Sequence, residues 1–297
     1  MSNRNYEKVV VLETGEVIQL PTGYIDNPHN YYIRSKSQDK AYRKCQNRSQ
    51  RATEKFYWSN LDNISNLIAE RKLSTSTLGL LLLLGCHLQN GSDILCNQKK
   101  NPYTTAQLVE KTGVPKRTFV RAMDELKACG IIIIEGTAKK PVYKLNTDYH
   151  FVGTNPQASK SARTYVNGVK ALQESGLSLS EIGFIYAVLP LLAYDRCVLV
   201  KDRGTGEELD NPHDISSLCE YIGITRRNLS NYLNMTFEYE FKDGRYKVPV
   251  FGKFSAGGSR VYAYLMNPVI VRRAVKADLS NYDSLEAMFK IYRKKVA

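Results

Sequence analysis

The chain has 297 residues, enough for two ordinary domains of about 100 to 200 residues each, and its apolar and charged fractions are typical of a folded protein. Its formal charge of +13 and isoelectric point of about 9.3 favour a polyanionic partner, with nucleic acid ahead of an anionic membrane surface. The longest apolar run, 78–84, is far shorter than the roughly 20 residues of a membrane-spanning helix, and the N-terminus lacks a continuous apolar segment, so we expect neither a membrane partner nor secretion.

The first predicted segment is a basic N-terminal arm over residues 1–57. Residues 31–55 are rich in lysine, arginine and tyrosine, which is typical either of an arm that contacts DNA or of a solvated helix face. A helix is expected next, because apolar residues follow at helical spacing: Leu61, Ile64, Leu67 and Ile68.

An internal repeat accounts for most of the remaining chain. Each copy contains an apolar helix, a strand-like segment, an Asn-Pro step, two helices joined at a glycine, and a return strand that ends near an asparagine. The first copy begins at Leu73 and the second at Leu177, and Gly79 matches Gly183. Residues 237–246 have no counterpart in the first copy.

The paired helices in each copy have the pattern of a helix-turn-helix. The first pair covers 104–126 and turns at Gly113, and the second covers 213–235 and turns at Gly223. Apolar residues stand at the same distances from both glycines, as two short helices that cross over one core require.

Two helix starts are marked independently by capping-box patterns: Thr104 with Gln107, and Ser178 with Glu181. After each helix pair we expect a wing, which is two strands joined by a loop. The expected strands are 131–134 and 142–145 in the first copy, and 248–251 and 261–265 in the second.

These elements predict a mainly α fold with small β wings (α+β), made of two tandem winged helix-turn-helix domains joined by a helical linker. The predicted boundaries are 58–154 for the first domain, 155–176 for the linker helix, 177–275 for the second domain and 276–297 for a C-terminal amphipathic helix. That last helix carries an apolar face for packing or self-association: Leu285, Met288, Phe289 and Tyr292.

The second helix of a helix-turn-helix lies in the major groove, so its outward residues are the candidate DNA contacts. They are Lys116, Arg117, Thr118 and Arg121 in the first copy, and Arg226, Arg227, Asn228 and Asn231 in the second. Arginine pairs with guanine and asparagine with adenine, and either can hold phosphate. Lys139, Lys140 and Arg260 in the wings are expected to reach phosphate or the minor groove. Each of these residues taken singly is equally well explained as an exposed polar side chain.

The sequence lacks the signatures of enzymes. His29, His87, His150 and His213 stand alone, so no metal pair of a nickase is formed, and no phosphate-binding loop or nucleophile elbow occurs. The cysteines are scattered and are interpreted as reduced thiols: Cys45, Cys86, Cys96, Cys129, Cys197 and Cys219. We therefore expect no enzyme, no cofactor and no metal.

The first half resembles the plasmid replication and maintenance initiators of the RepL type. The similarity covers about half of the chain: the ETGEV opening at 13–17, the basic and aromatic stretch after it, the helix-turn-helix, and the LNTDYHFVG ending at 145–153. The chain departs from that family at Thr147, where proline is favoured, and in having a second copy, which carries the Asn267-Pro268 step. The resemblance implies a DNA-binding replication protein.

We expect a sequence-specific double-stranded DNA-binding protein of a plasmid or phage-like element, acting in the cytoplasm as a replication initiator that binds an origin or as a transcriptional regulator. The alternative is a winged-helix protein-interaction module that docks a polymerase or nuclease. Duplex DNA is the expected partner, with the replication or transcription machinery and a second copy of the chain as further candidates.

Overall fold

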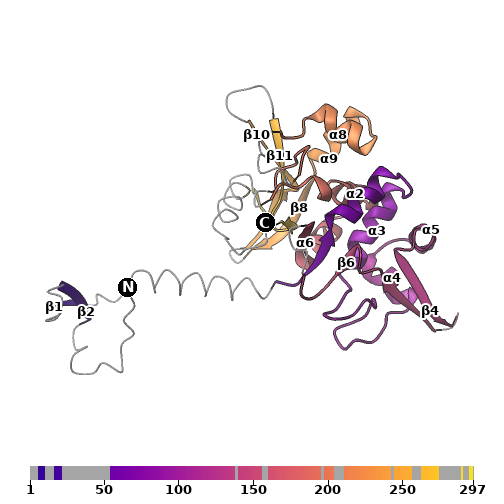
Figure 1. Ribbon diagram of the computed structural model, residues 1–297, viewed down its shortest axis with the longest axis horizontal. Coiled ribbons are helices and arrows are strands. Elements are labelled where there is room, and N and C mark those ends of the chain that lie inside the picture. Colours follow the sequence, from indigo (N-terminus) through magenta and orange to yellow (C-terminus); the bar gives the residue numbers. More distant parts are fainter. Residues whose placement is uncertain are drawn as a thin grey trace. The chain divides into compact units, whose positions relative to one another are not determined.

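The computed structural model describes residues 6–10, 17–21, 54–137, 140–155, 160–194, 197–203, 211–241, 244–255, 262–273, 289 and 294–296 (Figure 1). The chain divides into two compact parts, the N-terminal part Met1–Thr53 and the main part Glu54–Ala297. In the N-terminal part, β1 (Tyr6–Val10) pairs antiparallel with β2 (Val17–Pro21), and 22–53 of the expected basic arm lie outside the described residues. All elements described below belong to the main part.

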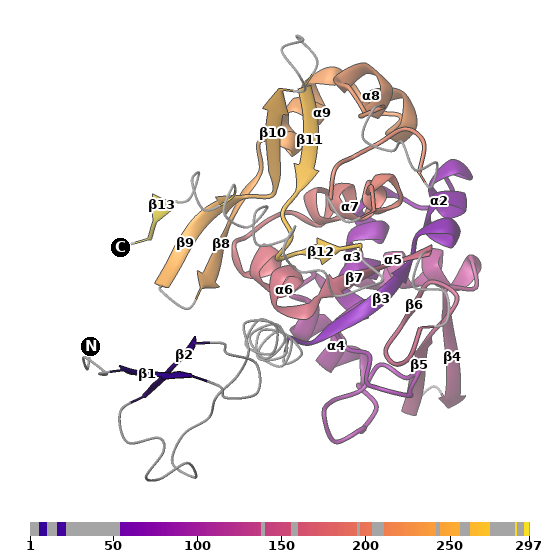
Figure 2. The same ribbon diagram turned by 60° about the vertical axis from the view of Figure 1, so that its left-hand side comes forward.

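A four-stranded antiparallel sheet occupies the middle of the main part (Figure 2). Its strands are, in spatial order, β12 (Val271–Arg272), β7 (Ser161–Tyr165), β3 (Phe56–Asn60) and β6 (His150–Phe151). Tyr57 points from this sheet into the core, where its hydroxyl donates to the carbonyl oxygen of Leu82 at 2.7 Å. The sheet therefore packs against the apolar helices of the main part.

The core is completed by α2 (Leu61–Ala69), α3 (Thr75–Gly85), α6 (Val166–Glu174), α7 (Leu179–Ala187) and the short 3-10 helix η3 (Leu189–Leu191). Helices α3 and α7 are buried on nearly all sides and cross at Gly79 and Gly183. A Cβ atom at either glycine would collide with the backbone of the facing helix, so only glycine permits this close approach.

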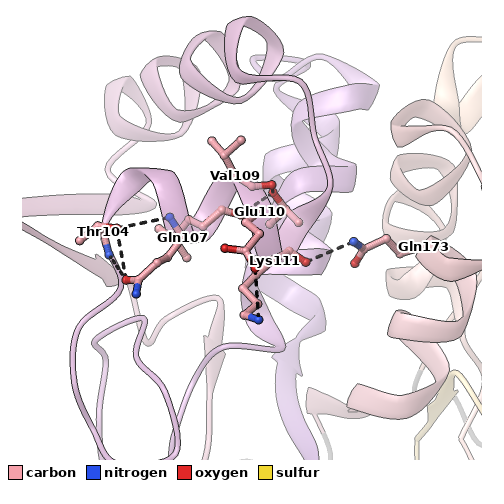
Figure 3. Close-up of polar contacts among 8 residues, drawn as sticks. Thr104, Gln107, Val109, Glu110, Lys111 and Gln173 are labelled. Carbon is pink, nitrogen blue, oxygen red and sulfur yellow. Dashed lines mark hydrogen bonds and ion pairs between the residues drawn. The ribbon is translucent and has the colours of Figure 1, made fainter.

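The first helix-turn-helix unit consists of α4 (Thr105–Thr112) and α5 (Lys116–Ala128), followed by the hairpin of β4 (Ile132–Thr137) and β5 (Lys140–Leu145). The predicted capping box of Thr104 and Gln107 starts α4 (Figure 3). Helix α4 ends at Gly113 with a φ of 61°, a left-handed conformation that favours glycine.

The second helix-turn-helix unit consists of α8 (Ile215–Ile222) and α9 (Arg226–Leu233) and turns at Gly223 with a φ of 76°. Two hairpins follow it. The first joins β8 (Thr236–Phe241) to β9 (Gly244–Pro249), which also pairs with β13 (Lys294–Lys295). The second joins β10 (Phe251–Ser255) to β11 (Tyr262–Met266).

The expected fold class is wrong. The chain is an α+β mix, not a mainly α pair of winged helix-turn-helix domains, because strands are abundant and both halves share one sheet and one helix pair. The segment 155–176, expected as a linker helix, contains β7 and α6 and buries Ala162, Val169 and Leu172. A free linker would leave such apolar side chains in water, and burial in the common core avoids that cost.

One further expectation needs correction, and another lies largely outside the described residues. The second wing was expected to begin at residue 248, but 244–249 pair with 236–241 instead, so the following hairpin begins at Phe251. Of the apolar face expected in the C-terminal helix, only Phe289 is described; it is buried against Gly252 of β10.

The sequence repeat has a counterpart in the hydrogen bonds of the two halves. Leu95 N–H donates to the carbonyl oxygen of Tyr143 at 2.9 Å, and the matched Leu199 N–H donates to that of Tyr264 at 2.8 Å. Both bonds tie the strand-like segment after the apolar helix to the return strand. The same backbone architecture is therefore built twice within one core.

The asparagine that ends each return strand also repeats its contacts. The Asn146 side-chain amide donates to the carbonyl oxygen of Gly130 at 3.3 Å, and that of Asn267 donates to Pro249 at 2.9 Å. In the described part of the chain, none of the helices has the length and apolarity that crossing a bilayer requires.

Candidate nucleic-acid interface

Helix α5 separates its apolar and charged residues onto opposite sides. Its inward face consists of buried apolar side chains: Phe119, Ala122, Met123 and Leu126. Lys116, Arg117 and Arg121 are exposed on the other side, while Thr118 is only partly exposed. The four predicted contacts of the first helix-turn-helix unit thus lie on one helix, and three of them are exposed to solvent.

Thr118 differs from its neighbours on α5 in lining a cavity. A cavity of about 500 Å³ lies between the turn that joins α4 to α5 and the start of α7, and Thr118 lines it together with Ser178 and Gln173. Among the residues that line it, none is charged and none is a histidine or cysteine. Thr118 is consequently less available to a duplex than its neighbours on α5.

Glu125 fixes α5 to the start of α3. Its carboxylate accepts hydrogen bonds from the Ser74 N–H at 3.2 Å, the Ser74 hydroxyl at 2.9 Å and the Thr77 hydroxyl at 2.5 Å. Burial alone would raise the pKa of Glu125, but these donors and the nearby Arg121 lower it below its usual value. An ionised Glu125 therefore caps α3 and sets the orientation of α5.

Helix α9 repeats this arrangement with different side chains. Leu229 and Leu233 are buried, whereas all four predicted contacts are exposed: Arg226, Arg227, Asn228 and Asn231. The helix starts at Thr225, whose hydroxyl accepts from the Asn228 N–H at 3.4 Å. Helix α9 therefore presents arginine and asparagine to solvent, whereas α5 presents lysine and arginine.

The hairpins contribute further cations. Lys140 is exposed at the start of β5, and Lys139 and Arg260 lie outside the described residues. Sequence reasoning missed Lys253 and Tyr262 on the β10–β11 hairpin, where the ammonium nitrogen lies 3.7 Å from the ring centroid and 46% of Tyr262 is exposed. The only sequence signal for this pair was a lysine in the first strand and an aromatic residue at the start of the second.

Each helix-turn-helix turn is held by a side chain from the other half of the core, where the first half is the part that starts with β3 and the second half is the part that starts with β7. The Gln173 amide donates to the carbonyl oxygen of Lys111 at 3.2 Å, at the end of α4 (Figure 3). The Arg71 guanidinium donates to the carbonyl oxygen of Glu220 at 3.5 Å, at the end of α8, and lies against Gly223. One free carbonyl group at the end of each of these helices is thus satisfied from across the core.

The histidines are structural in the described residues. Burial lowers the pKa of His150 to about 3 and those of His87 and His213 to about 4, so all three are neutral at pH 7. His29 lies outside the described residues. In the part of the chain that the structure describes, no three histidine, cysteine, aspartate or glutamate side chains gather as metal ligands.

No protein-family model, curated protein or solved structure matches the chain. None of these comparisons tests the resemblance to the RepL-type initiators, which stays an expectation from the sequence motifs.

Proposed function

We propose that the chain binds duplex DNA through α5 and α9. The observation that supports this proposal occurs twice: a helix follows a left-handed glycine turn, buries its apolar side and presents cationic side chains to solvent. Within the described residues, ion pairs involve other lysines and arginines and leave the outward cations of these two helices unpaired. Unpaired cations on a helix of this motif suit the phosphates and base edges of a major groove.

The two helices would contribute different contacts. Arg117 and Arg121 on α5, and Arg227 on α9, suit bidentate hydrogen bonds to guanine, and Asn231 suits adenine. Lys140 and Lys253 on the hairpins suit phosphate contacts, which position a protein without reading sequence. The reaction is binding alone: recognition of a site and recruitment of other proteins to it.

The biological role that we propose is at an origin of replication or at an operator of a plasmid or phage-like element, in the cytoplasm. It rests on the sequence similarity to RepL-type initiators. Selection of bound duplexes from a random library, followed by mapping of the enriched sequence in the source genome, separates an origin from a promoter.

The DNA-binding proposal is tested by titrating random-sequence duplex with the full chain at several salt concentrations, using fluorescence anisotropy. We expect the logarithm of the binding constant to fall steeply with the logarithm of salt concentration, by about 0.9 for each phosphate neutralised. A slope near zero would contradict the proposal.

A second candidate function, docking of a protein, is favoured by apolar side chains that are exposed on the first unit: Val120 on α5, and Ile133 and Ile134 on β4. Exposed apolar residues of this size are uncommon among the described residues and suit a protein partner. The same salt titration distinguishes the two candidates, because an apolar interface does not require release of counterions from DNA.

A further inference from the structure

The two halves of the core are related by a two-fold axis. Strands β3 and β7 each run directly into a helix, so Phe56 matches Ser161 and Asn60 matches Tyr165. In the sheet, however, Phe56 pairs with Tyr165 and Asn60 pairs with Ser161. The first position of one strand thus faces the last position of the other, which is the exchange that a two-fold axis produces.

Contacts between matched residues mark where this axis passes. Trp58 and Arg163, the middle positions of the two strands, face each other in the register. The hydroxyl groups of Ser59 and Thr164, the next matched pair, share a hydrogen bond at 2.7 Å. Outward from this centre the sheet is also symmetric, because β6 flanks β3 as β12 flanks β7.

The same axis relates α3 and α7. A Cβ at Gly79 would meet the carbonyl oxygen of Leu179, and a Cβ at Gly183 would meet that of Thr75. Because Gly79 matches Gly183 and Thr75 matches Leu179, the two contacts are equivalent. The helix pair and the sheet therefore give independent evidence for one two-fold relation. The segments that follow repeat their hydrogen bonds in both halves, so the same relation is expected to extend to the helix-turn-helix units.

The two halves are joined as the subunits of a symmetric dimer are, without a free linker. Gln173 of the second half holds the turn of the first unit, and Arg71 of the first half holds the turn of the second. Figure 2 shows α8 and α9 above the α3–α7 pair, and α4 with the β4–β5 hairpin below it. The separation and relative orientation of the two units are therefore set by the core.

We propose that one chain binds as a pseudo-dimer, reading two half-sites in inverted orientation at a single fixed spacing. This inference rests on the proposed DNA binding. Two-fold symmetric helix-turn-helix dimers bind sites whose halves are inverted, because the symmetry of the protein matches the local symmetry of the duplex. Since α5 and α9 differ in their outward residues, the two half-sites differ in sequence, and one chain suffices for both.

The test begins with the duplex most enriched by the full chain from a random-sequence library. Three altered duplexes are then compared with it in anisotropy titrations with the unaltered protein: one half-site inverted, 5 base pairs inserted between the halves, and 10 base pairs inserted. We expect each change to weaken binding at least about tenfold, the effect of removing one good bidentate hydrogen-bond pair. Salt concentration is held fixed, so the counterion-release contribution of each phosphate contact is the same in all arms.

Each outcome is decisive. Undiminished binding to the duplex with one inverted half would overturn the inverted arrangement, and recovery of affinity with 10 inserted base pairs would overturn the fixed spacing, because a flexible pair of units regains its face of the helix after one turn. Two chains per enriched duplex in sedimentation would overturn the pseudo-dimer. These failures leave DNA binding intact, whereas the absence of any enriched duplex together with a flat salt slope overturns the proposed function itself.

Discussion

At the scale of single residues, the exposure of the described cations on α5 and α9 was predictable from the sequence, but the contacts that hold these helices were not. Arg117 and Arg121 are exposed as expected, because the apolar spacing of α5 already fixes which side is buried. The contact of Glu125 with Ser74 depends on how α5 crosses α3, which no local pattern encodes. Lys253 and Tyr262 were missed for the same reason, since a strand position gives little information about exposure.

A residue-scale prediction concerns His150, which is buried with its Nε2 atom 3.0 Å from the Tyr186 hydroxyl. Burial lowers the pKa of His150 from 6.5 to about 3, so between these values the unfolded chain takes up the proton first. The stability that comes from a neutral His150 is thus complete above pH 6.5 and falls as the pH drops toward 3. We expect urea midpoints to fall over this range.

The contribution of His150 to that pH dependence is isolated by substitution. His150→Phe should reduce the slope of unfolding free energy against pH by up to about 1.4 kcal/mol per pH unit between pH 6 and 4, since one proton fewer is taken up on unfolding. His87, His213 and Glu125, whose pKa values are also lowered in the fold, contribute to the remaining slope. An unchanged slope in the His150 variant, measured by urea unfolding at each pH, would show that His150 is not buried in its neutral form.

At the scale of elements, helix starts, turns and the strand pairing of the first wing were predictable, and the pairing of strands distant in the sequence was not. The capping boxes at Thr104 and Ser178 are confirmed, and both turn glycines adopt the left-handed conformation. These features are local, because a cap or a turn is specified by residues three or four positions apart. The strand 161–165 was assigned to a linker, because its pairing with 56–60 is non-local and its sequence lacks a β-branched run.

An element-scale prediction concerns the crossing of α3 and α7. Gly183→Ala places a methyl group against the backbone at Thr75, which cannot yield without separating the helices, so we expect a loss of about 1 to 3 kcal/mol in unfolding free energy. Ser180→Ala, on the same helix but only partly buried, serves as the matched control and should change stability by less than about 0.5 kcal/mol. Urea unfolding of both variants provides the measurement; equal stability of the two would show that the helices do not meet at this glycine.

At the scale of the whole molecule, the sequence revealed the repeat but not the way its copies combine. Matched positions such as Gly79 and Gly183 indicated duplication, yet two separate domains and one shared core have the same internal spacing. The antiparallel pairing of 56–60 with 161–165 and the crossing of α3 with α7 distinguish them, and both place the two helix-turn-helix units on one core. The extra hairpin formed by 236–249 breaks the symmetry and explains why the repeat could not be aligned there.

The most direct test of DNA binding through both α5 and α9 is hydroxyl-radical footprinting of the full chain on its most enriched duplex. We predict two protected blocks. Arg117→Ala with Arg121→Ala should remove one block, and Arg227→Ala with Asn231→Ala should remove the other, because each hydrogen-bonded base recognised by these side chains contributes about 1 to 3 kcal/mol. Lys72→Ala, which removes an exposed cation paired with Glu70 at 3.0 Å, is the control and should leave both blocks unchanged. If both double variants stay folded by circular dichroism and retain both blocks at unchanged affinity, the claim that these helices read DNA is wrong.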